Sequence, residues 1–210
     1  MIFIGDVHGK YKQYKRILKE SSAPTIQVGD MGVGFRRIQG WRAGEYIENP
    51  PHAWMLKGNH RFIRGNHDNP KVCRHHSQCI PDGHVENGIM FIGGAVSIDQ
   101  AWRVKDYSWW EDEELSELEL SDLIDKYVMI KPDVMVTHEC PENVANAMIT
   151  HLGRTKFDWP SRTRRAFEMM FSAHSPKLWV FGHWHFSFDG IMNGTRFVCL
   201  NELEVRDLEV

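Results

Sequence analysis

The segment MIFIGDVH, residues 1–8, contains the pattern that predicts the fold of this chain. Four apolar residues are followed by a glycine and then by Asp6, and His8 lies two positions further on. A short apolar run that ends at a Gly-Asp turn is typical of a buried strand. In α/β sheets, ligands bind just beyond the carboxyl ends of the strands. The segment therefore predicts a strand that leads directly into a binding site.

The same pattern occurs four more times along the chain. The further strand-like runs each end at an Asp, Asn or His: residues 25–28 at Gly29-Asp30, 61–64 at Gly65-Asn66-His67-Asp68, 134–137 at His138, and 178–181 at Gly182-His183-Trp184-His185. Side chains alternate along an extended segment, so the pair Asp6 and His8 should lie on one side of the chain. The same argument applies to His183 and His185, and each pair could then clamp one ion.

The remaining segments predict an α/β protein. Apolar runs alternate with amphipathic stretches, for example residues 11–20, which have helical spacing. Near the end of the chain, Asn193-Gly194 separates two strand-like runs and predicts a hairpin. We find no linker, repeat or low-complexity segment, so we expect a single domain over residues 1–210.

The composition excludes several classes of protein. The chain has 210 residues and a net charge of −3, which gives no global attraction to nucleic acids or anionic membranes. Neither a signal peptide nor an apolar run of about 20 residues is present. The four cysteines show no repeating spacing. We therefore expect a cytoplasmic protein with reduced thiols and no membrane partner.

The polar residues at the strand ends are suitable metal ligands. Carboxylate, amide and imidazole groups together suit divalent ions such as Mn, Fe, Zn or Ni. No cysteine occurs within these motifs, which argues against a purely structural zinc site.

Taken in order, the five segments resemble the calcineurin-like metallophosphoesterase family. The resemblance extends from Gly5 to His185. It implies an α/β fold of the α/β/β/α kind, in which two mixed sheets form a sandwich flanked by helices, with the metals at one edge. Residues 93–99 and 108–111 are similar to a sub-branch of small bacterial and phage enzymes.

Carried over residue by residue, the resemblance implies a centre of two divalent metal ions. The first metal would be bound by Asp6, His8 and His185, and the second by Asn66, His138 and His183, with Asp30 bridging both. Manganese is the metal that we expect, and iron, zinc, nickel and magnesium are the alternatives. Such a centre produces a hydroxide that attacks the phosphorus atom.

Two further residues are assigned to catalysis by the same resemblance. His67 would protonate the leaving oxygen or steady the phosphate. Arg64 resembles the arginine that holds the phosphate in the protein-phosphatase branch. A second Gly-Asn-His, residues 58–60, lacks the following aspartate, and we favour residues 65–68 as the functional copy. The protein-phosphatase branch has an Asp-Arg-Gly block where this chain has residues 31–35, which argues against a phosphoprotein phosphatase.

The expected function is therefore hydrolysis of phosphate esters. We expect a preference for phosphodiesters, cyclic nucleotides included. The alternatives are a phosphomonoesterase, a nuclease acting on single strands or ends, and a scaffold without catalysis. A nucleotide is a candidate substrate, whereas the acidic run over residues 111–122 disfavours nucleic acid.

Trp109 and Trp110 either stack on a base or anchor the following helix. The arginines at 162, 164 and 165 either attract phosphate or form a solvated helix face.

Overall fold

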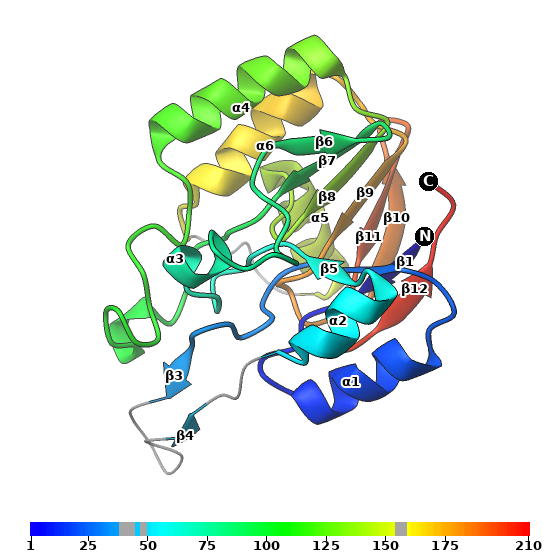
Figure 1. Cartoon of the computed structure of the whole chain (residues 1–210). Helices are drawn as coiled ribbons and strands as arrows, with labels where there is room; N and C mark the ends of the chain where they lie inside the picture. The colour runs from blue at the N-terminus through cyan, green and yellow to red at the C-terminus, as the bar shows by residue number, and fades with distance from the viewer. Residues whose placement is uncertain (38–44, 47–49, 154–158) are drawn as a thin grey trace.

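Two mixed β-sheets pack against each other in the computed structural model of the chain (Figure 1), which describes residues 1–37, 45–46, 50–153 and 159–210. The smaller sheet has the order β12-β1-β2-β5. Its strands are β1 (Ile2–Ile4), β2 (Thr25–Gln27), β5 (Arg61–Phe62) and β12 (Val205–Asp207). Strands β1, β2 and β5 are parallel, and β12 is antiparallel to β1.

The larger sheet has six strands in the order β10-β11-β9-β8-β7-β6. They are β6 (His84–Glu86), β7 (Ile89–Ile92), β8 (Val134–Thr137), β9 (Leu178–Phe181), β10 (Phe188–Met192) and β11 (Thr195–Cys199). The four inner strands are parallel, and each edge strand is antiparallel to its neighbour. A separate ribbon pairs β3 (Arg36–Arg37) with β4 (Glu45–Tyr46).

The inner strands are mostly apolar because both faces of each sheet are largely buried. In β9, Val180 belongs to the cluster between the two sheets, whereas Trp179 belongs to the cluster under the outer helices. Strand β1 divides in the same way, with Phe3 between the sheets and Ile4 on the outer face. Successive side chains point to opposite faces of a strand, so a continuous apolar run fills two cores at once.

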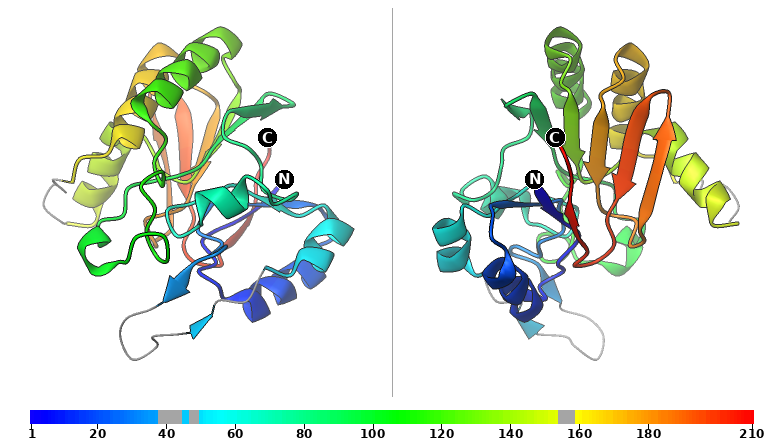
Figure 2. Two further views of the ribbon diagram at one scale, coloured as in Figure 1. Left: turned by 60° about the vertical axis from the view of Figure 1, so that its left-hand side comes forward. Right: turned by 90° about the vertical axis from the view of Figure 1, so that its right-hand side faces the viewer.

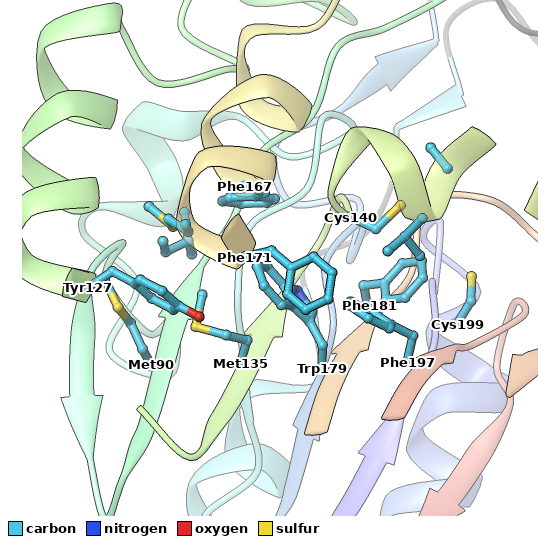
Figure 3. Packing of buried hydrophobic residues seen from close by; sticks show 14 of the residues in the cluster. Met90, Tyr127, Met135, Cys140, Phe167, Phe171, Trp179, Phe181, Phe197 and Cys199 are labelled. Atoms are coloured by element: carbon cyan, nitrogen blue, oxygen red, sulfur yellow. The ribbon is translucent and has the colours of Figure 1, made fainter. Parts of the chain in front are cut away.

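Helices cover the outer face of each sheet (Figure 2). The six-stranded sheet lies beneath α4 (Glu117–Ile130), α5 (Glu142–His151) and α6 (Arg162–Ala173). In Figure 3, Phe167 and Phe171 of α6 face Trp179 and Phe197 of the sheet. The four-stranded sheet lies beneath α1 (Tyr11–Glu20), α2 (His52–Gly58) and α3 (Pro70–Cys73). A short 3-10 helix, η1 (Gln100–Trp102), follows β7 in the chain. The expected α/β/β/α arrangement is confirmed.

The expected elements are largely confirmed. Helix α1 has the predicted bounds, and Asn193-Gly194 joins β10 to β11, with a positive φ at both residues. Strands β6, β7 and β12 were not predicted. Strands β6 and β12 are short and polar, and β7 is apolar but is not followed by an Asp, Asn or His. Within the described ranges, no helix has the length and apolar character needed to cross a membrane.

Asp68 joins the two loops that follow β2 and β5. Its carboxylate is fully buried and accepts hydrogen bonds from the backbone N–H groups of Met31, Gly32 and Val33, at 2.6–3.1 Å. It also accepts a bond of 2.8 Å from the N–H of Gly65. One side chain therefore fixes both loops relative to each other, and both loops carry candidate ligands.

We expect Asp68→Ala to destabilise the metal-free protein by about 3 kcal/mol or more. Several buried N–H groups would lose their hydrogen-bond acceptor, and each unpaired group costs about 1–3 kcal/mol of folding free energy. Urea unfolding followed by circular dichroism measures this change. Asp112→Ala is the matched control, since Asp112 is more than half exposed and forms an ion pair with Arg74 at the surface. Its loss should cost at most about 1 kcal/mol. Equal stability of the two variants would show that Asp68 does not hold the loops.

Candidate metal centre

The first group of candidate ligands lies where β1 and β2 end. One ligand atom from each of Asp6, His8, Asp30 and His185 lies within 4.8 Å of the others. The Nε2 atoms of His8 and His185 are 2.9 Å apart, and Asp6 Oδ2 is 3.3 Å from His185 Nε2. Lone pairs from three segments of the chain therefore converge on one point.

The second group consists of Asp30, His138 and His183. One ligand atom from each of these residues also lies within 4.8 Å of the others. His138 follows β8 and His183 follows β9, so the larger sheet supplies this half of the centre. His138 Nε2 lies 3.2 Å from Asp30 Oδ1. Asp30 belongs to both groups, which is the arrangement that a carboxylate bridging two ions requires.

Asn66 adjoins the second group through its amide oxygen. Asn66 Oδ1 lies 3.1 Å from His138 Nε2, and its Nδ2 donates to Ser97 Oγ at 3.0 Å. Ser97 in turn donates through both its hydroxyl and its backbone N–H to the buried Glu113. This chain of bonds turns the amide so that its oxygen, the atom able to bind a metal, faces His138.

Two details of hydrogen bonding fit a bound cation. Asp30 is 1% exposed, and its Oδ2 has no hydrogen-bond partner in the described residues. A buried carboxylate oxygen without a partner is costly unless a cation is nearby. His138 Nδ1 lies 2.8 Å from the carbonyl oxygen of Val28 and must donate to it, so Nε2 is left free as a ligand.

The charges of the centre are strongly coupled. Burial alone would raise the pKa of Asp6, but His185 and His8 outweigh it and lower that pKa to about 2. Burial alone would also raise the pKa of Asp30, but the charge of His138 outweighs it, and the pKa is lowered well below its ordinary value. Burial opposes charge on His138, but Asp30 raises its pKa to about 10. Without a metal, the imidazolium of His138 thus supplies the positive charge that these carboxylates need.

The backbone of the centre is unusual and corrects one expectation. His8, Asp30, His183 and His185 all have positive φ angles, between 46° and 69°. Such residues cost about 1–3 kcal/mol each and cluster at functional sites. The expectation that His183 and His185 share one side of an extended segment is wrong. Because of the left-handed turns, His185 joins the first group and His183 joins the second.

Glycines at two of these turns leave room for the ligands. A Cβ atom on Gly29, which has a φ of +101°, would lie 2.3 Å from His138 Nδ1. A Cβ atom on Gly65 would lie 2.1 Å from Asp30 Oδ1. Both contacts are with rigid parts of the centre, so any larger residue would displace a candidate ligand.

His67 lies beside the two groups without belonging to either of them. Its backbone N–H donates to Asp30 Oδ1 at 2.7 Å, and its ring stacks on Phe35 with centroids 5.1 Å apart. Burial and the nearby Arg103 lower the pKa of His67 well below its usual value, although Asp30 opposes this shift. The ring is therefore neutral in the metal-free protein.

The contacts of Arg64 do not support the expected phosphate contact. Its Nε donates to Asp82 at 2.7 Å, and Nη1 donates to the carbonyl oxygen of Glu113 at 2.7 Å. Arg64 lines a different cavity, of about 480 Å³, together with Cys73 and Asp82. The guanidinium thus connects three loops, which is a structural role.

Sequence reasoning missed several charged residues at the centre, Arg103 and Glu139 among them. Arg103 places Nη2 2.5 Å from His67 Nε2. Glu139 is fully buried, accepts a hydrogen bond from Trp184 Nε1 at 2.8 Å, and places Oε2 3.7 Å from His183 Nε2. The position of Glu139, directly after His138, was an available signal, whereas Arg103 belongs to no motif.

The second Gly-Asn-His lies apart from the centre. Asn59 ends α2 in a left-handed conformation, and His60 Nδ1 pairs with Thr25 Oγ1 at 3.1 Å. His60 therefore has a structural environment. Cys73 and Cys79 are free thiols.

The other ambiguous motifs also have structural surroundings. Trp110 is buried against Phe35, which favours an anchoring role. Arg164 is buried between Glu139 and Glu142, and Arg165 pairs with Glu117 at the surface. These contacts favour packing and helix-surface roles for these residues.

A cavity of about 870 Å³ opens beside the centre. At one end it is lined by candidate metal-centre residues, which are Asp30, Asn66, His67, His183 and His185. Arg103, Ile98, Leu152, Trp184 and Phe186 also line it. A cavity of this size accepts a small organic molecule.

Comparison with known proteins agrees with this geometry. The calcineurin-like phosphoesterase family matches residues 1–187. One solved structure that is similar to the chain is "GAP50 the anchor in the inner membrane complex of Plasmodium", with 12% identity, a TM-score of 0.46, and coverage of 96% of this chain and 71% of that chain. No curated protein matches the chain.

We expect Asp30→Asn to weaken metal binding at both positions, because Asp30 belongs to both ligand groups. Loss of a residue that hydrogen-bonds to a metal ligand typically lowers metal affinity about 10–100-fold. Loss of a ligand that both ions share should lower it at least as much. Elemental analysis after dialysis against buffered free metal measures the content. His60→Gln is the control and should retain both ions. If Asp30→Asn still holds two ions, Asp30 is not the bridge.

Proposed function

Because the chain belongs to the calcineurin-like phosphoesterase family, we propose that it hydrolyses phosphate esters with the help of two divalent metal ions. The observation that carries this proposal is the pair of ligand groups that share Asp30. One oxygen of Asp30 already accepts the N–H of His67, whereas the other is buried without a hydrogen-bond partner among the described residues.

The residues of each group fit one metal position. Asp6, His8 and His185 would hold the first ion, Asn66, His138 and His183 would hold the second, and Asp30 would be shared by both. The mixture of carboxylate, amide and imidazole ligands supports manganese, with iron, zinc, nickel or magnesium as alternatives. Asp6 and Asp30 offset the repulsion between the two cations.

Two such ions, when bound, neutralise charge on the phosphate and make a water molecule between them more acidic. The chain's own contribution to the reaction is orientation and proton transfer. His67 lines the cavity next to Asp30, and Phe35 fixes the plane of its ring. A phosphate bound there brings negative charge close to His67, which favours the protonated ring. His67 then donates that proton to the leaving oxygen.

The substrate that we propose is a small phosphodiester, cyclic nucleotides included. The cavity beside the centre suits a molecule of nucleotide size, and its apolar residues suit a base. The Asp-Arg-Gly block of the protein-phosphatase branch is replaced by residues 31–35. The four free cysteines support action in a reducing compartment, for which we propose the cytoplasm.

Removal of metal should abolish hydrolysis, and its return should restore it. We expect the chelator-treated protein to lose its activity. Mn, Fe, Zn, Ni and Mg are then added back separately, and manganese should restore the highest activity. The substrates are bis-nitrophenyl phosphate, 2′,3′-cyclic nucleotides and phosphoserine peptides. The diesters should be cleaved fastest. Metal-free protein that hydrolyses at the full rate would contradict the proposal, and so would a metal-loaded protein that cleaves none of these esters.

The role of His67 should depend on the leaving group. A positioned acid contributes about 10²–10⁴-fold to the rate. We expect His67→Ala to keep both metals and to lose that much activity on a cyclic nucleotide, whose ribose oxygen needs a proton. Bis-nitrophenyl phosphate should lose less, because nitrophenolate leaves without one. Metal analysis and steady-state rates on both substrates measure this, and an equal loss would leave His67 with a phosphate-binding role only.

A further inference from the structure

The loop between β7 and α4 brings an arginine into the cavity beside the metal centre. The side chain of Arg103 is 6% exposed, yet it lines the cavity together with Asp30 and His67. Its Nη2 lies 2.5 Å from His67 Nε2, and its Nη1 donates to the carbonyl oxygen of Ser108 at 3.3 Å. One edge of the guanidinium is thus tied to its own loop, and the other edge faces the centre.

An aromatic ring supports this placement. The ring of Phe35 stacks on His67 with an interplanar angle of 20°, and the guanidinium carbon of Arg103 lies 5.8 Å from the same ring. A cation near an aromatic ring is attracted to it, and the ring restricts its movement. Arg103 is therefore held in place before any substrate arrives, which reduces the entropy lost on binding.

Asp99 occupies the position that an anion would take. Its Oδ1 lies 2.7 Å from Arg103 Nη2, but it lacks the alignment of a hydrogen bond. The side chain of Asp99 is 49% exposed, so it can turn towards solvent. The carboxylate of Asp99 is therefore an ion-pair partner that no aligned hydrogen bond from the described residues holds in place. A phosphate is a stronger one, because the planar fork of arginine matches its oxygens.

We propose that Arg103 binds the phosphate group of the substrate and that this phosphate displaces the carboxylate of Asp99. The inference rests on the proposed phosphoesterase function and identifies a residue of the cavity that holds the phosphate. Arg103 has the role that the family resemblance implied for Arg64, whose guanidinium is bound to Asp82 and Glu113. The apolar residues Trp184 and Phe186 then face the organic part of the ester.

Two substitutions should act in opposite directions on phosphate binding. The probe is inorganic phosphate, titrated into the manganese-loaded full chain by calorimetry. We expect Arg103→Met to weaken binding about 10–100-fold, as for loss of a hydrogen bond to a charged group. Asp99→Asn should tighten binding, because the competing negative charge is gone. Arg103→Lys should lie between Arg103→Met and the wild type, since lysine keeps the charge but loses the fork.

Control variants separate this role from a structural one. Arg74→Met removes an exposed arginine that pairs with Asp112 and should leave phosphate binding unchanged. Metal content and thermal stability are measured for each variant. If the Arg103–Asp99 pair only stabilises the loop, both substitutions weaken phosphate binding, and the inference is overturned.

Steady-state kinetics adds an independent reading. Arg103→Met should raise KM for bis-nitrophenyl phosphate more than it lowers kcat, in proportion to the loss of phosphate affinity. If the wild type hydrolyses esters but Arg103→Met binds phosphate normally, only this inference fails. If the metal-loaded wild type hydrolyses none of the tested esters, the proposed function fails.

Discussion

The buried carboxylate of Asp30 is the feature on which the rest of the site depends. A charge buried without a partner is expensive, and a protein can usually avoid that cost by protonating the group. Here the surrounding histidines lower the pKa of Asp30, so it stays ionised. Its Oδ2 lacks a hydrogen-bond partner in the part of the chain that the structure describes. A cation is therefore the natural complement of this site, and the strained backbone around it is tolerated because it brings ligands to that oxygen.

Three buried aspartates meet here, and their partners separate their roles. Asp68 is surrounded by backbone N–H groups, which satisfy its oxygens and connect two loops. Asp6 and Asp30 instead face imidazole rings whose nitrogens converge on them. Burial and the charge of Asp30 raise the pKa of Asp68 to about 6, whereas that of Asp6 is lowered to about 2. Residue type alone does not identify a metal ligand, because the donors around the carboxylate decide its role.

The sequence was sufficient for the strand ends and for the residues that converge on Asp30. Five strand-like runs ending in polar residues predicted ligand positions beyond the strand ends, and the family resemblance implied that both sheets bring them to one edge. The separation of His183 from His185 could not follow from alternation along a strand, since both residues have left-handed backbones. Strand β12 is too short and too polar to give a periodic signal. Its position beside β1 is fixed by tertiary pairing.

The two arginines show where local sequence stops being informative. Arg64 directly precedes the Gly-Asn-His-Asp motif, but the carbonyl of Glu113 and the carboxylate of Asp82 bind its guanidinium. The same long loop that supplies Glu113 also carries Arg103 to His67, 36 positions away in sequence. Phe35, which supports both His67 and Arg103, belongs to the segment that replaces the Asp-Arg-Gly block. The segment that departs from the protein-phosphatase pattern therefore contributes the ring that contacts His67 and an arginine from another loop.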